Sequence, residues 1–112
     1  GGVTILRKGA VDIITNGDQF CLISEPHSLR RCGGQGDILA GVIGLWLHWC
    51  CMCPDSKQIA IPITAAYAGS YLTRQFAVDA FNKYKRSTLT TDMIECIPTV
   101  MDKEFPLIQS SL

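Results

Sequence analysis

Residues 30–41 are Arg30-Arg31-Cys32-Gly33-Gly34-Gln35-Gly36-Asp37-Ile38-Leu39-Ala40-Gly41. Three glycines precede one aspartate at the point where an apolar segment begins. Glycine tolerates positive φ and lets the backbone approach a ligand closely, while the first N–H groups of a helix carry partial positive charge. The run therefore predicts an anion-binding turn at the start of a helix, and phosphate is the anion that fits such a turn.

Asp37 has two interpretations. Aspartate is a favoured N-cap residue, so its carboxylate could simply accept a backbone N–H at the helix start. A carboxylate beside bound phosphate would instead be repelled unless it takes part in the chemistry, for example as a base. The two neighbouring arginines suit phosphate oxygens, with surface solubility as the alternative explanation.

The chain before this run predicts strands. Residues 3–6 are a β-branched run, which we expect to be a buried strand of a larger parallel sheet; it ends near Lys8, a cation that either reaches phosphate or is merely solvated. Residues 12–15 and 20–23 flank Asn16-Gly17-Asp18, and Asn-Gly between apolar runs is a strong hairpin signal. Residues 24–31 form a polar loop.

Three helices follow. The apolar residues 38–52 predict a buried helix in which Gly41 and Gly44 allow close packing, and residues 62 to about 85 predict a second helix with a small-residue face. A third helix should begin near residues 91–92, with a kink or an early end at Pro98. The expected fold class is α/β, with one strand plus a hairpin followed by three helices.

The composition of the chain argues against several classes of ligand and partner. The 112 residues include ten Lys plus Arg against ten Asp plus Glu, so no basic stripe argues for nucleic acid or an anionic membrane. Six cysteines include one Cys-x-x-Cys pair without a second ligand pair, which favours free thiols, no metal site, and a cytosolic or organellar protein. The chain opens at Gly1 without methionine, so we expect a fragment.

Several motifs occur in a familiar order and spacing. They are Lys8-Gly9-Ala10-Val11-Asp12, Asn16-Gly17-Asp18, the run 30–41, Leu47-His48-Trp49, Leu72-Thr73-Arg74-Gln75, Arg86-Ser87-Thr88 and Thr91-Asp92-Met93-Ile94. Together they resemble the C-terminal part of the ATP-dependent NAD(P)H-hydrate dehydratase family, in its eukaryotic branch, which has a ribokinase-like fold. Gly-x-Gly-Asp alone would indicate only the ribokinase-like superfamily. The resemblance implies that residues 1–112 are the C-terminal portion of one such domain, whose N-terminal part is absent.

The resemblance also implies an activity. Hydrated NADH or NADPH (NADHX or NADPHX) would lose water, driven by ATP with Mg²⁺, to give NADH or NADPH, ADP and phosphate. Asp37 would be the catalytic base and would contact the substrate hydroxyl. The implied ATP-binding residues are Lys8, Gly9, Ala10, Val11, Asp12, His27, Ser28, Leu29, Arg30, Arg31, Cys32, Gly33, Gly34, Gln35 and Gly36.

Two other functions stay open from the sequence. One is a noncatalytic fragment that keeps an ATP-binding half, and the other is a ribokinase-like small-molecule kinase in which a phosphate ester is the product. We expect no nucleic-acid or membrane partner and a cytoplasmic location, with the mitochondrion as a second compartment. Whether the protein forms a homo-oligomer is left open.

Overall fold

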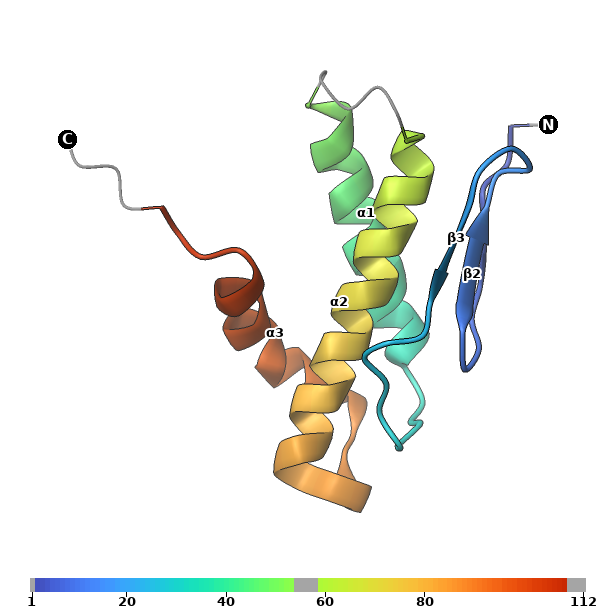
Figure 1. Ribbon diagram of the computed structural model, residues 1–112. Coiled ribbons are helices and arrows are strands. Elements are labelled where there is room, and N and C mark those ends of the chain that lie inside the picture. The colour runs from blue at the N-terminus through green and yellow to red at the C-terminus, as the bar shows by residue number, and fades with distance from the viewer. Residues whose placement is uncertain (1, 54–58, 109–112) are drawn as a thin grey trace.

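The computed structural model describes residues 2–53 and 59–108. Strands β1 (Ile5–Arg7), β2 (Asp12–Thr15) and β3 (Phe20–Ile23) precede helices α1 (Gln35–Cys51), α2 (Ile61–Tyr84) and α3 (Thr90–Glu104), with a short 3₁₀ helix, η1 (Lys85–Ser87), between α2 and α3. Helix α2 runs through the middle of the molecule, with the sheet on one side and α3 on the other, while α1 lies alongside α2 (Figure 1). The predicted order of one strand, a hairpin and three helices is confirmed.

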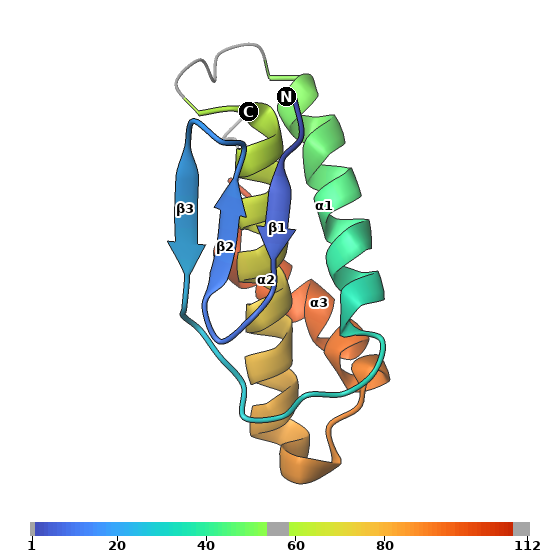
Figure 2. The ribbon, with the colours of Figure 1, turned by 90° about the vertical axis from the view of Figure 1, so that its right-hand side faces the viewer.

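The sheet is antiparallel throughout, in the order β1-β2-β3, and it covers α2 as Figure 2 shows. The hairpin is the one predicted, and Gly17 has φ +97° in its turn, a conformation that side chains other than that of glycine rarely adopt. Within the described residues β1 pairs only with β2, and antiparallel, while the parallel neighbours expected for the first strand would lie outside this chain and stay a prediction. A short β-branched run does not specify the direction of its neighbour.

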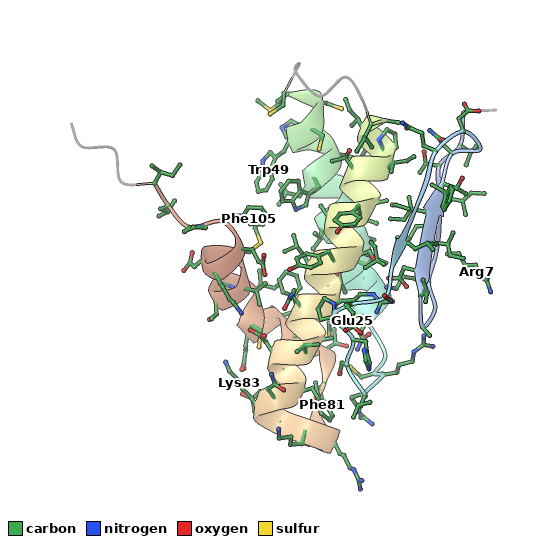
Figure 3. The ribbon with its side chains drawn as sticks, viewed as in Figure 1. Arg7, Glu25, Trp49, Phe81, Lys83 and Phe105 are labelled. Atoms are coloured by element: carbon green, nitrogen blue, oxygen red, sulfur yellow. The ribbon has the colours of Figure 1, made fainter. Side chains whose placement is uncertain are left out.

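The two faces of the sheet differ. Residues directly opposite each other in the register share a face, so Leu6, Ile14 and Cys21 lie toward α2, where Ile14 is fully buried. The opposite face carries Ile5, Phe20 and Leu22, each more than half exposed. Arg7 also projects from that face, away from the helices (Figure 3). The expectation of a buried first strand is therefore wrong for this chain.

Helix α2 holds two clusters of the core. One cluster joins the C-terminal half of α2 to α3, through side chains such as Phe76 and Val100. The other joins the first turns of α2 to the sheet. Gly69 faces Ile43 of α1 so closely that no Cβ would fit there. Gly69 of the small-residue face predicted for this helix thus lies where α1 approaches, while Ala66 packs toward the sheet.

Helix α1 is less buried than its composition predicts. Leu39 is its one buried residue, Leu45 and Trp49 are more than 40% exposed, and nothing lies within 4 Å of a Cβ built on Gly41 or Gly44. Within this chain the expected burial and close glycine packing of this helix are not found, because only one side of α1 rests on α2. An apolar sequence indicates that a helix can be buried, but it does not indicate which elements pack against it.

Helix α3 continues past Pro98 to Glu104, so of the two expected outcomes the early end is wrong and the kink stays a prediction. Its buried residues lie on both sides of the proline, with Met93 and Cys96 before it and Val100 after it, all packed on α2. That packing offsets the hydrogen bond that proline removes. Beyond α3, the ring of Phe105 lies 5.3 Å from that of Trp46 in α1, and Figure 3 shows Phe105 and Trp49 on the same side of the molecule.

Candidate functional site

The glycine turn at the start of α1 has the geometry that its sequence predicts. Gly34 is the N-cap residue, with φ +95°, and its carbonyl accepts the N–H of Asp37 at 3.1 Å. The hydroxyl of Thr90, the first residue of α3, donates to the Gly33 carbonyl, and a Cβ on Gly34 would lie 3.2 Å from the Thr90 side chain. Glycine is therefore required at position 34 for two reasons: the positive φ of the backbone and the close approach of α3.

Asp37 is not the N-cap. It is the third residue of α1, after Gln35 and Gly36, and it is exposed. A carboxylate in the first turn still interacts favourably with the helix dipole. The sequence-based prediction that Asp37 could be the N-cap is wrong, because the N-cap is Gly34, which has no side chain to cap the helix. An exposed carboxylate at this place is accessible to a ligand.

A hollow of about 890 Å³ lies between the β1–β2 turn, the segment from Ser24 to Gly36, the start of α1 and the middle of α2. Its volume is within the range of small-molecule sites. Its lining residues are Lys8, Gly9, Ala10, Ser24, Glu25, His27, Ser28, Leu29, Arg30, Arg31, Cys32, Gln35, Gly36, Leu39, Thr73, Arg74 and Ala77. In Figure 3, Glu25 lies on the segment that leads from β3 toward α1, beside α2.

Most of the residues predicted to bind ATP line this hollow. The structure thus brings together two segments, residues 8–10 and most of residues 27–36, that are separated in the chain by the hairpin. The exceptions are Val11, Asp12, Gly33 and Gly34, none of which lines the hollow, and the predicted base Asp37 does not line it either. Whether any of these residues contacts ATP stays a prediction.

Asp12 has a structural role that the sequence did not indicate. Its carboxylate is fully buried and accepts four hydrogen bonds: from Arg74 Nε (2.9 Å), Ser70 Oγ (2.5 Å), Lys8 Nζ (2.5 Å) and the Gly9 N–H (3.0 Å). Burial alone raises the pKa of Asp12, but the hydrogen bonds from Arg74, Lys8, Ser70 and Gly9 outweigh it and hold the pKa well below its usual range. Asp12 is therefore ionised, and its carboxylate is enclosed by its partners within the fold.

Arg74 connects the elements around the hollow. Its Nη1 donates to the carbonyls of Ser24 and Pro26, both at 3.2 Å, and its Nη2 donates to those of Gly9 and Ala10 at 3.0 and 3.1 Å. The guanidinium thus ties α2 to the β1–β2 turn and to the loop after β3. No sequence pattern assigned a role to Arg74, although a buried aspartate in a strand requires a cationic partner elsewhere in the chain.

The cations of the hollow are partly engaged. Lys8 pairs with Asp12 while its side chain remains 42% exposed, and Arg30 Nε donates to the Thr88 carbonyl at 3.2 Å. Arg31 and His27 are exposed, and His27 Nδ1 lies 3.5 Å from a Glu25 oxygen. Lysine and arginine side chains therefore outnumber the one carboxylate of the lining, which favours an anionic ligand.

The comparison with known families decides the classification. The family model described as NAD(P)H-hydrate dehydratase matches residues 1–99. The chain belongs to the NAD(P)H-hydrate dehydratase family. This confirms the resemblance drawn from the motifs, and it identifies the three strands and three helices as part of the ribokinase-like domain of that family.

Relatives in the NAD(P)H-hydrate dehydratase family are similar over nearly the whole chain. The ATP-dependent (S)-NAD(P)H-hydrate dehydratase of Ciona intestinalis is 46% identical over 107 residues, which cover 94% of this chain and 29% of the relative. That of Arabidopsis thaliana is 49% identical over 100 residues (87% and 27%), and that of Homo sapiens 42% over 107 residues (94% and 31%). The chain spans less than a third of the length of these relatives.

Within the described residues, no helix is both long and apolar enough to cross a membrane.

Proposed function

We propose that the protein dehydrates the S-form of NADHX or NADPHX with ATP, giving NADH or NADPH, ADP and phosphate, and that this chain supplies the ATP-phosphate turn and the base. The observation that carries the proposal is the exposed carboxylate of Asp37, directly after a glycine turn with a left-handed Gly34 and beside a cation-rich hollow. The names of the relatives, ATP-dependent (S)-NAD(P)H-hydrate dehydratases, support this reaction.

The chemistry assigns two roles to the chain. Asp37 accepts the proton of the substrate hydroxyl as its oxygen attacks the γ-phosphorus of ATP, and ADP leaves. The N–H groups at the start of α1 stabilise the charge on the phosphoryl oxygens. The resulting phosphate ester loses inorganic phosphate and a proton from the adjacent carbon, because phosphate is a far better leaving group than hydroxide. The double bond of the reduced nicotinamide is thereby restored.

Mg²⁺ is part of the proposal. It is usually held by one or two carboxylates together with substrate phosphates, and Glu25 in the lining fits that donor set, which leaves Asp37 as the base. When bound, the ion would neutralise phosphate charge. Removing Mg²⁺ with a chelator should abolish turnover while leaving the thermal midpoint of the protein without ATP unchanged.

We also propose that residues 1–112 are the C-terminal part of one larger domain. The exposed apolar face of the sheet and the uncovered side of α1 support this, since monomers rarely leave such surfaces open. The remaining part would cover them and complete the substrate site. If the 112 residues alone gave a soluble monomer with a cooperative thermal transition and protected strand amides, this proposal would be contradicted.

The decisive experiment compares Asp37→Asn with the wild type in the complete protein encoded by the full reading frame. Asparagine keeps the shape but cannot take the proton, so turnover of NADHX should fall roughly 100-fold or more while ATP still binds. Release of phosphate and absorbance of the reduced nicotinamide measure turnover. Asp102 is an exposed carboxylate near the end of α3, so Asp102→Asn is the matched control and should keep full activity. Near wild-type turnover by Asp37→Asn would refute the assignment of the base.

Product analysis separates the alternatives. A small-molecule kinase would leave a stable phosphate ester, and a noncatalytic protein would form neither ester nor phosphate. The short coverage of the relatives is the observation that favours the noncatalytic alternative for residues 1–112 alone. We expect the complete protein to be cytoplasmic or mitochondrial, which cell fractionation would test.

A further inference from the structure

Thr73 of α2 has a buried hydroxyl with no hydrogen-bond partner in the part of the chain that the structure describes. The residue is 5% exposed and lines the hollow. Threonine hydroxyls in helices commonly donate to the carbonyl one turn earlier, as Thr64 of the same helix does toward Ala60 at 3.4 Å. Ser70 of the same helix donates to Asp12. Buried polar groups without partners are rare, so the Thr73 hydroxyl indicates a missing partner.

The surroundings of Thr73 indicate what that partner is. Four residues of the lining are buried: Leu39, Thr73, Arg74 and Ala77. Arg74 is committed to Asp12 and to backbone carbonyls. The remaining buried surface is therefore apolar apart from one hydroxyl, while Gly36 of the glycine turn and Arg31 are exposed residues of the lining.

A ligand that fits this distribution has an anionic end and a flat apolar part with hydrogen-bonding groups at its edge. A nucleotide has both. Its phosphates suit the turn around Gly34, and its base suits the buried surface of Leu39 and Ala77. The hydroxyl can donate to a ring nitrogen or accept from an exocyclic amine, both of which adenine presents.

We propose that the hydroxyl of Thr73 hydrogen-bonds to the edge of the adenine base of bound ATP and so contributes to nucleotide recognition. The inference rests on the proposed ATP site, and it adds a residue on α2 to a site otherwise formed by the β1–β2 turn and the loop before α1. Thr73 acts in binding and takes no part in the proton transfer at Asp37.

The test uses Thr73→Val and Thr73→Ser in the complete protein, with ATP and inorganic tripolyphosphate as probes. Valine has the shape of threonine without the hydroxyl, so ATP affinity should fall roughly tenfold, since the base edge loses its partner. Tripolyphosphate has no base, so its affinity should not change. Thr73→Ser keeps the hydroxyl and should bind ATP within about twofold of the wild type.

Stability in the absence of nucleotide gives a second readout. Valine removes an unsatisfied buried hydroxyl, so the thermal midpoint of Thr73→Val without ATP should be equal to or above that of the wild type. A purely structural role for the hydroxyl would lower the midpoint and would affect both probes equally. Weaker ATP binding combined with an unchanged or higher midpoint therefore identifies a ligand contact.

The remaining outcomes separate this inference from the proposed function. If wild-type protein binds ATP and Thr73→Val binds it equally well, the base contact is refuted and the ATP site stands. Equal loss of ATP and tripolyphosphate affinity would also refute it. If the wild type binds no ATP, the inference and the proposed function fail together.

Discussion

Two aspartates in this chain show opposite environments. Asp12 is fully buried, accepts hydrogen bonds from four donors and has a pKa held below its usual range, with Arg74 as its main partner. Asp37 is exposed in the first turn of α1, beside a glycine turn and a cation-rich hollow. A carboxylate that has satisfied its hydrogen bonds within the fold stabilises structure, whereas one that is accessible can accept a proton from a substrate. The comparison assigns stability to Asp12 and chemistry to Asp37.

The largest expected effect on stability is that of Asp12→Ala. It would leave the guanidinium of Arg74 buried without a counter-ion, so the free energy of unfolding should fall by about 3–5 kcal/mol. Urea unfolding of the complete protein measures the loss. Asp102→Ala on the exposed surface of α3 is the control and should change stability by less than about 0.5 kcal/mol.

The double variant Asp12→Ala with Arg74→Met sharpens this result. Removing both charges avoids the unpaired cation, so the double variant should be more stable than Asp12→Ala alone. Equal or greater destabilisation of the double variant would mean that the Arg74 bonds to backbone carbonyls contribute more than its pairing with Asp12.

The next effect is in the pH dependence of stability. The folded pKa of Asp12 is depressed, so its contribution is fully present above the unfolded pKa near 4 and is lost as pH falls toward the folded pKa. In that window the unfolded state binds the proton first, which costs about 1.4 kcal/mol of stability per pH unit. Unfolding measured below pH 4 should show a steeper acid loss in the wild type than in Asp12→Asn. Identical slopes would contradict the assigned pKa direction.

Smaller effects distinguish the two glycines of the turn. Gly34→Ala places a side chain at φ +95° against Thr90, so it should cost about 1–2 kcal/mol of stability and weaken ATP binding. Gly36→Ala meets nothing within 4 Å and should be neutral or slightly stabilising. Gly36 lines the hollow, so the Cβ that alanine adds there should still reduce ATP affinity. Unchanged ATP affinity in both variants would place the phosphates elsewhere.

Local signals predicted much of this fold. The Asn16-Gly17 turn set the hairpin and its register, and the glycine run located the start of α1, because both depend on residues adjacent in the chain. Distant partners were not predictable in this way. Arg74 meets Asp12 across 62 residues, and Thr90 meets Gly33 across 57. Neither pairing leaves a periodicity or a spacing in the sequence.

The errors have the same origin. The apolar residues of α1 and of the first strand indicated burial, but burial depends on what packs against them, and here Leu45 and Ile5 remain exposed. Most of the predicted ATP-binding residues line one hollow, since the two segments flank the same hairpin. Asp12 belongs to that motif in sequence and yet points into the core, which only its partners on α2 could reveal.

The hydrogen bond from Thr90 to Gly33 has a consequence for synthesis on the ribosome. The glycine turn precedes α1 and α2, but its shape depends on the first residue of α3, which is translated 57 positions later. We expect the nascent chain to acquire affinity for ATP only after α3 has emerged and docked. Nucleotide would then stabilise the finished domain without assisting the folding of its earlier helices.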